Sequence, residues 1–123
     1  MGAHTPEQLH ELFAETVNNK DIEGLLALYD KSCLTADLEG KQVQGEASLR
    51  AFLEALLDTI SHIEGTTRKV LVNGDVALLS TAWTASVNTP AGPQIATGTT
   101  GEVARKQADG IWRFVIDDPQ FVP

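Results

Sequence analysis

The chain has 123 residues, 42% of them hydrophobic and 21% charged, and a formal net charge of −8 at pH 7. This composition is typical of one globular domain, residues 1–123, and excludes a collagenous or disordered chain. No basic cluster is present, which argues against nucleic acid and anionic membrane as partners, because phosphate binding needs a positive surface.

We expect neither a membrane span nor a secretory signal. No segment approaches the roughly 20 apolar residues that a spanning helix needs. The first five residues lack the basic and apolar regions of a signal peptide, so we expect a cytoplasmic protein. The single cysteine, Cys33, excludes an internal disulfide and a cysteine-based zinc site.

Helices are predicted in the first half of the chain. Thr5 is expected to cap a first helix, with Pro6 at its first position and Gln8 closing a capping box. Asp21 is expected to cap a second helix that runs to Tyr29. Residues 33–38 and 42–45 predict a small hairpin, and the apolar period of residues 47–60 predicts a third helix.

Strands and turns are predicted from residue 62 onward. Asn73-Gly74 is a strong hairpin signal between strands at 68–72 and 76–83. Further turns are expected at residues 89–93 and 107–110. The pattern predicts an α+β fold in which three helices lie on one face of a four-stranded antiparallel meander.

This order of elements and several local motifs resemble the nuclear transport factor two-like superfamily, over nearly the whole chain. The superfamily includes ketosteroid isomerase and the SnoaL-like polyketide cyclases. The resemblance implies a cone-shaped barrel, made by a curved antiparallel sheet packed against three helices, and a homodimer. The motifs that carry it are Asp21-Ile22-Glu23-Gly24-Leu25, Leu28-Tyr29-Asp30, Gly45-Glu46-Ala47 and Asp109-Gly110-Ile111-Trp112-Arg113.

The resemblance also implies catalytic positions. The general base of ketosteroid isomerase falls on Asp37, the protonated acid of its oxyanion hole on Glu102, and its tyrosine on Phe13. Phenylalanine cannot donate a hydrogen bond to a developing enolate, so Phe13 departs from the pattern of the isomerase. The acid/base aspartate of the SnoaL-like cyclases falls on Asp117, although a register shift of one residue would exchange it with Asp118.

The last hairpin constrains these acids independently of the family. If residues 107–110 form a four-residue loop, Glu102 lies opposite Val115, and Glu102, Arg113, Val115 and Asp117 share one face. Trp112, Phe114 and Ile116 then lie on the other face. We predict that the acid-bearing face lines a pocket, where burial raises the pKa of Glu102 or Asp37.

A non-catalytic interpretation stands beside each acid. Glu102 could lie exposed at a sheet edge or be neutralised by Arg113, Asp37 could be a turn residue before Gly40, and Asp117 could prepare a turn at Pro119. His62 cannot pair with the adjacent Ser61 as a nucleophile, because neighbouring residues of a strand point to opposite faces. His62 remains a candidate pocket residue, and His4 and His10 are expected to be solvated.

The pocket walls and the dimer interface follow from these assignments. The aromatic outer face, with Trp83, Trp112 and Phe114, would expose a large apolar patch, so we expect it to be covered by a second copy of the chain, with ligand stacking as the alternative. The scattered histidines predict no metal site, and no cofactor is expected. The predicted ligand-binding residues are Phe13, Val17, Tyr29, Phe52, Leu56, His62, Ser80, Ala82 and Val115.

Two functions are consistent with these features. The first is an enzyme, independent of cofactors, that transfers protons in an apolar or cyclic metabolite, of the isomerase, cyclase or dehydratase type. In it Asp37 would be the base, Glu102 the acid or hydrogen-bond donor, and Asp117 an auxiliary polar group. The second is a non-catalytic ligand-binding or dimerisation module of the same fold.

Overall fold

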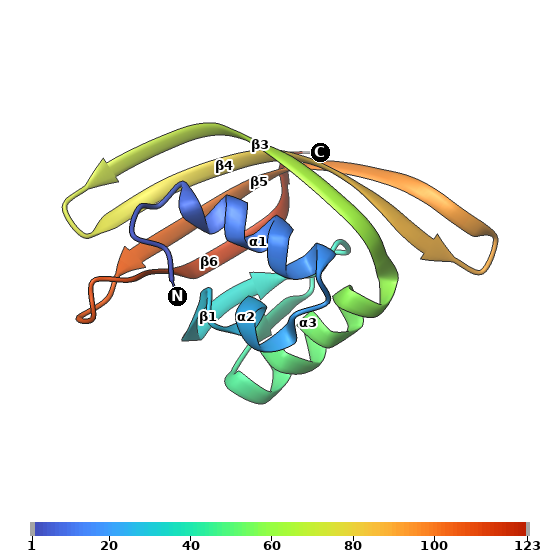
Figure 1. The fold of residues 1–123 in the computed structure, drawn as a ribbon, viewed down its shortest axis with the longest axis horizontal. Helices are drawn as coiled ribbons and strands as arrows, with labels where there is room; N and C mark the ends of the chain where they lie inside the picture. The colour runs from blue at the N-terminus through green and yellow to red at the C-terminus, as the bar shows by residue number, and fades with distance from the viewer. Residues whose placement is uncertain (1, 123) are drawn as a thin grey trace.

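One curved six-stranded sheet carries three helices on its concave side in the computed structural model, which describes residues 2–122 (Figure 1). Within the sheet the order is β2-β1-β6-β5-β4-β3, and every neighbouring pair is antiparallel except β1 and β6. This confirms the predicted α+β fold. The elements are α1 (Gln8–Asn18), α2 (Ile22–Leu26), β1 (Tyr29–Ala36), β2 (Gln42–Gln44), α3 (Glu46–Thr59), β3 (Ile60–Asn73), β4 (Val76–Thr89), β5 (Gly92–Lys106) and β6 (Trp112–Val122).

The helix starts follow from local hydrogen bonds. Asp21 caps α2 as predicted, and its carboxylate accepts a hydrogen bond from the Gly24 amide at 3.0 Å. The start of α1 is later than predicted, because the Gln8 side chain accepts from the His4 amide at 2.6 Å and Thr5 makes no capping bond. None of the described helices is long and apolar enough to cross a membrane.

Tyr29 lies at the start of β1 and not in the second helix, where we predicted it. The reason is a partner distant in sequence: β1 runs parallel to β6, with Tyr29 opposite Phe114. The Phe114 amide donates to the Leu28 carbonyl at 2.8 Å. The sheet thus supplies the backbone hydrogen bonds that continuation of the helix would have supplied, and local propensity gives way to tertiary pairing.

The hairpin predicted at Asn73-Gly74 is present and exceptionally long. Strands β3 and β4 have 14 residues each and arch over α1, with Gly74 at φ +62° in the turn (Figure 1). Register shifts in β3, between Ile60 and His62 and between Thr67 and Lys69, interrupt the ladder with β4. Such bulges increase the local twist and bend a strand, which lets the sheet wrap around the helices.

The last hairpin has a different register from the predicted one. Its loop is one residue longer, so that Lys106 pairs with Trp112, and a bulge at Val115 shifts the pairing once more. The two shifts together place Glu102 directly opposite Asp117. The predicted common face of these two acids is therefore observed, although neither has the partner that we expected.

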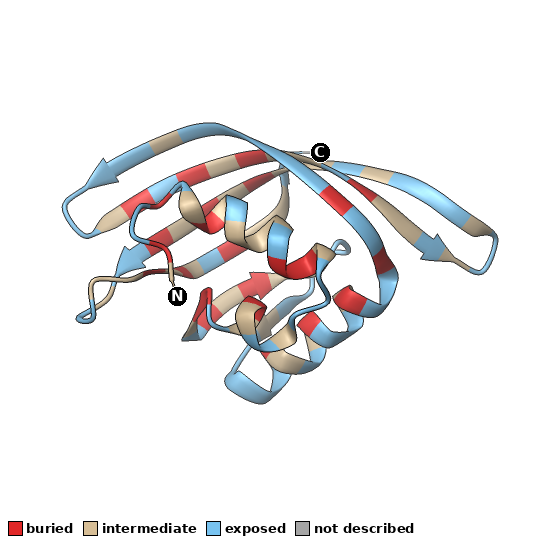
Figure 2. Cartoon of the chain, in the orientation of Figure 1, coloured by how far each residue is buried: buried red, intermediate tan, exposed pale blue. Residues whose placement is uncertain are grey.

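The longer loop reverses the predicted sides of Trp112 and Phe114, and the bulge then returns Ile116 and Asp117 to their predicted sides. Before it, Trp112 and Phe114 point to the concave face, where both are buried under the helices. After it, Ile116 points outward and is 46% exposed. Figure 2 shows buried positions concentrated where the middle of the sheet faces the helices, while the tips of the long hairpins are exposed.

A lysine ties the loop after α1 to the end of α3. The Lys20 ammonium donates hydrogen bonds to the carbonyl oxygens of Leu57, at 2.7 Å, and of Ile60. Carbonyls at the end of a helix lack intrahelical donors, and a positive charge there is favourable. Lys20 thus fixes the separation of α1 and α3, the two helices that enclose the cavity described below.

We predict that Lys20→Met lowers the free energy of unfolding by about 1 kcal/mol, because two carbonyl groups lose a charged donor. Chemical denaturation measures this change. Lys31→Met is the matched control, because Lys31 is exposed on β1. Equal effects of the two substitutions would contradict the assigned role of Lys20.

Candidate active site

A cavity of about 490 Å³ lies between the concave face of the sheet and the helices α1 and α3. This volume is within the range of small-molecule sites, which are mostly apolar with a few polar groups. The helices provide one wall and strands β3 to β6 provide the other. The apolar lining includes Phe13, Ala14, Phe52, Leu56, Ile63 and Trp83.

Two buried carboxylates line this cavity side by side. Glu102 of β5 and Asp117 of β6 are direct cross-strand partners and are 5% and 9% exposed. Side chains opposite each other in an antiparallel pair lie on the same face of the sheet, about 5 Å apart at Cβ. Two acids held together out of water cannot both ionise cheaply, so this arrangement favours protonation of one of them.

Glu102 is paired with a histidine that the sequence analysis had expected to be solvated. The side chain of His10 on α1 is only 8% exposed, and its Nε2 lies 2.6 Å from Glu102 Oε1. Its Nδ1 lies 2.7 Å from Thr67 Oγ1, and the Thr100 hydroxyl donates to Glu102 Oε1 at 2.9 Å. The ring is thereby fixed at both nitrogens, and the Glu102 carboxylate has two polar partners.

Asp117 has a different environment. The Tyr29 hydroxyl donates to Asp117 Oδ2 at 3.1 Å. Burial, followed by the negative charge of Glu102, raises the pKa of Asp117 to about 8, while the bond from Tyr29 opposes this shift. Burial also raises the pKa of Tyr29 well above its ordinary value, so the phenol remains a donor. Asp117 consequently holds its proton at neutral pH.

Three threonines form a row across the sheet beside these acids. Thr67, Thr81 and Thr100 occupy paired positions of β3, β4 and β5, and the Thr81 amide donates to Thr100 Oγ1 at 2.9 Å. The two outer hydroxyls bind His10 and Glu102. Within the described part of the chain, the buried Thr81 hydroxyl has no hydrogen-bond partner. The row positions the histidine–glutamate pair from the sheet side.

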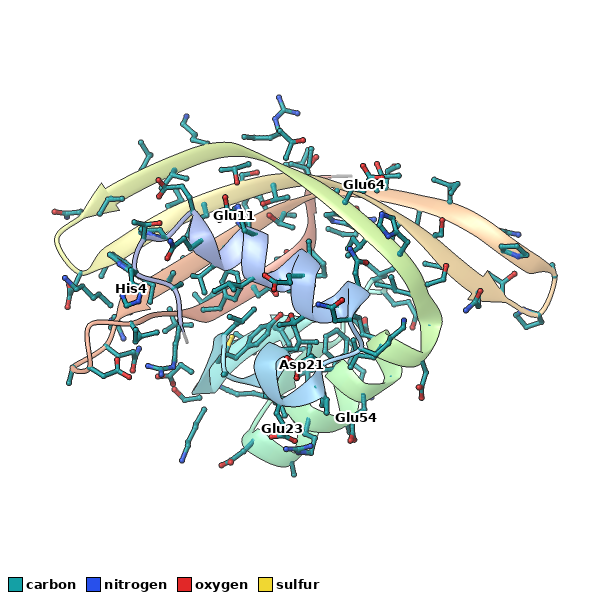
Figure 3. The ribbon with its side chains drawn as sticks, in the orientation of Figure 1. His4, Glu11, Asp21, Glu23, Glu54 and Glu64 are labelled. Carbon is teal, nitrogen blue, oxygen red and sulfur yellow. The ribbon has the colours of Figure 1, made fainter. Side chains whose placement is uncertain are left out.

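Asp37 also lines the cavity. It follows β1, and its Oδ1 accepts hydrogen bonds from the amides of Glu39 and Lys41, both at 2.9 Å. This is the turn geometry that we considered as the alternative to a catalytic role. The exposed Glu39 and Glu64 also line the cavity, so its rim is acidic. Figure 3 labels Glu64 on β3, where this strand crosses over the helices.

The predicted cavity walls are found only in part. Phe13, Phe52 and Leu56 line the cavity. The other six predicted wall residues do not line it. Val17 and Tyr29 are packed in the core, and His62 is exposed and lies 3.5 Å from Glu64. Ser80 and Ala82 alternate with the cavity-lining Thr81 and Trp83 and so point to the opposite face, and Val115 forms the bulge.

The predicted aromatic outer face does not exist as we described it. Trp83 lines the cavity, and Trp112 and Phe114 are buried on the concave side of the sheet, so none of the three is available on the outer face. In β4, Trp83 alternates onto the cavity side together with Thr81, and in the last hairpin the longer loop places Trp112 and Phe114 on the concave side. The alternative that we weighed for Trp83, contact with a ligand, is consistent with its position in the cavity wall.

His10 is the important site residue that was not among those predicted. It lies three residues before Phe13, on the same side of α1, and the periodicity of this helix could have placed both on the inner face. Because histidine is more often exposed than buried, this spacing was not taken as evidence that His10 is buried. Within residues 2–122 no group of three or more His, Cys, Asp or Glu side chains is arranged to hold a metal ion.

Comparisons with solved structures establish the fold independently. The chain is similar to a protein of unknown function from Mycobacterium tuberculosis, with 26% identity and a TM-score of 0.73 over 91% of this chain and 66% of that chain, so it spans about two thirds of that relative. A protein with a cystatin-like fold from Nostoc punctiforme is 21% identical, with a TM-score of 0.71 over 95% of this chain and 88% of that one. An NTF-2 like protein of unknown function from Shewanella oneidensis is 16% identical, with a TM-score of 0.75 over 91% and 93%.

The sequence matches none of the curated proteins with which it was compared. A family model, in contrast, matches residues 7–122, which include every helix and strand and the whole buried acid cluster. The NTF2-like, cystatin-like fold that the motifs predicted is therefore supported by both sequence and structure, and the chain belongs to the family of SnoaL-like domains.

Proposed function

We propose that this SnoaL-like domain binds a small, apolar, ring-containing molecule in its cavity and transfers a proton within it, without a cofactor. The reaction would be of the isomerase, cyclase or dehydratase type. The observation that carries this proposal is the direct pairing of Glu102 with Asp117, two buried carboxylates with different partners in the wall of an apolar cavity. Paired acids whose environments separate their pKa values can divide donor and acceptor roles.

The two acids have complementary parts in the proposed mechanism. Asp117, protonated at neutral pH, donates a hydrogen bond or its proton to the oxygen of a bound ligand. Glu102 takes a proton from the ligand, and His10, whose Nε2 lies 2.6 Å from Glu102 Oε1, holds the carboxylate in position. The proton then passes from Glu102 to a second atom of the ligand, and a proton that Asp117 gave to the ligand oxygen returns to Asp117. In a dehydration the proton from Asp117 leaves with the water, and the proton taken by Glu102 restores Asp117, so that no other reactant is needed.

Asp37 becomes a secondary candidate in this proposal. Its Oδ1 is bound by two backbone amides of the turn that follows β1. These bonds commit that oxygen to holding the turn, whereas Glu102 is buried directly opposite Asp117. We therefore assign the acceptor role to Glu102 and treat Asp37 as part of the acidic rim.

We predict that Glu102→Gln and Asp117→Asn each lower turnover by about 10²- to 10⁴-fold, the usual contribution of a general acid or base. Turnover is followed by ultraviolet absorbance for β,γ-unsaturated cyclic ketones that become conjugated, and by solvent deuterium exchange for saturated cyclic ketones. Asp37→Asn is the matched carboxylate control and is expected to retain turnover.

Two outcomes would contradict parts of this assignment. Loss of turnover in Asp37→Asn with retention in Glu102→Gln would return the role of base to Asp37. Ligand binding without proton exchange in the parent protein, across both classes of ketone, would favour the non-catalytic ligand-binding module.

The protonated state of Asp117 has a consequence for stability. Between about pH 4 and pH 8 the folded protein holds a proton that the unfolded chain releases, because the pKa rises from its ordinary 3.8 to about 8 on folding. The free energy of unfolding therefore falls as pH rises through this window, by up to about 1.4 kcal/mol per pH unit.

We predict that Asp117→Asn removes most of this slope, so that the variant is more stable than the parent at pH 8 and gains less at pH 5. Thermal unfolding at a series of pH values measures the difference. Asp58→Asn, at an exposed position of α3, is the control and should follow the parent curve. Parallel curves for Asp117→Asn and the parent would show that Asp117 is ionised in the folded protein.

A homodimer through the outer face of the sheet remains part of the proposal, with different residues from those predicted. Apolar side chains form a continuous cross-strand row on this face, from β3 through β4 and β5 to β6, and the three exposed ones are between 46% and 53% accessible. Contiguous exposed apolar surface of this kind often marks a protein interface. The row consists of Leu71, Leu78, Val103 and Ile116.

We predict that Leu78→Lys converts a dimer to a monomer without changing the circular dichroism spectrum, because it places a charge in the middle of the row. Light scattering coupled to gel filtration measures the mass. Ala51→Lys, on the exposed side of α3, should remain dimeric. A parent protein that is monomeric at micromolar concentration would contradict the interface.

A further inference from the structure

Trp83 is held in the wall of the cavity by two contacts. It is the cross-strand partner of Gly98, and a Cβ atom at Gly98 would lie only 2.6–2.8 Å from three atoms of the indole ring. The indole Nε1 donates to the Pro119 carbonyl at 2.8 Å. The ring therefore packs directly on the glycine backbone and is tethered at its edge, which fixes its orientation.

Aromatic side chains also line the cavity from the helix side. Phe13 of α1 and Phe52 of α3 face the same space as Trp83 of β4. Aromatic rings favour offset-stacked or edge-to-face contacts with another ring, beyond the value of the area that they bury. A planar ring system between these walls would gain this contribution, whereas a puckered ring of equal size would not.

The charges around the cavity exclude one class of ligand. Five carboxylic acids and one histidine are the ionisable groups that line it, and no lysine or arginine of the described residues is among them. The histidine is already paired with Glu102. An anionic ligand would meet like charges and find no free cation, so its binding would be opposed. The acids are Asp37, Glu39, Glu64, Glu102 and Asp117.

We propose that Trp83, seated on Gly98, is the stacking residue of this cavity, and that the cavity takes a planar ring compound without negative charge. This inference rests on the proposed function only in assigning the ligand to the same cavity. Trp83 then determines the shape of the accepted ligand, and the acidic lining determines its charge.

The experiment uses three probes of similar size at pH 7, with affinities measured by isothermal titration calorimetry. They are 2-naphthol, which is planar and neutral, decahydro-2-naphthol, which is puckered and neutral, and 2-naphthoate, which is planar and anionic. We expect 2-naphthol to bind at least about tenfold more tightly than each of the others, a ratio that corresponds to about 1.4 kcal/mol.

Three variants separate stacking from simple burial. Trp83→Leu should abolish the preference for 2-naphthol over its puckered analogue, and Trp83→Phe should restore part of it. Gly98→Ala should weaken 2-naphthol binding, because the added methyl group displaces the indole ring. A cooperative thermal unfolding transition shows which variants are folded. If Trp83→Leu does not fold, Gly98→Ala and Trp83→Phe provide the test.

Each outcome bears on the inference. Equal affinity for the three probes, no binding of any probe, or an unchanged preference in the folded Trp83 and Gly98 variants would overturn it. Because binding is measured without turnover, the expected preference in a protein that catalyses no proton exchange would leave this inference standing and remove the proposed function. Proton exchange together with equal affinities for the three probes would support the proposed function and overturn this inference.

Discussion

The bulge at Val115 is the constraint on which the candidate site depends. In a regular strand Trp112, Phe114 and Asp117 could not all point to the concave face, because side chains alternate with a period of two. The extra residue resets this alternation in the middle of β6. One half of the strand then contributes aromatic residues to the core under α1, and the other half contributes an acid to the cavity.

The second consequence of the bulge is electrostatic. It brings Asp117 opposite Glu102, so that two carboxylates share a water-poor wall. Their partners differ, since Glu102 is bound by His10 and Thr100 while Asp117 is bound by the Tyr29 phenol. The histidine comes from α1 and the tyrosine from the start of β1. The site therefore forms only when the helix, the parallel strand and the last hairpin are all in place.

Much of the fold follows from local sequence signals. The cap at Asp21, the apolar period of α3 and the turn at Asn73-Gly74 each predicted the element that is observed. These signals depend on neighbours in the chain. The placement of Tyr29 in β1 depends instead on β6, more than 80 residues away by the register of Tyr29 with Phe114, and no local pattern contains it.

The site was less predictable because it depends on strand parity. An error of one residue in the loop of the last hairpin, followed by an unforeseen bulge, exchanged the faces of Trp112 and Phe114 and left those of Glu102 and Asp117 correct. The predicted parity of β4 was also wrong by one residue, since Trp83 lines the cavity and Ser80 does not. His10 was missed for another reason, since its burial follows from its partner Glu102 and not from its own hydrophobicity.

The most direct test is to measure the pKa of the Asp117 side-chain carboxyl group by ¹³C nuclear magnetic resonance. The account predicts a transition near pH 8 in the folded protein, because burial and the neighbouring Glu102 oppose ionisation. Replacing Glu102 by glutamine should lower the midpoint. A midpoint in the ordinary range of aspartate, unchanged by Glu102→Gln, would contradict the protonated state of Asp117 and with it the proposed donor.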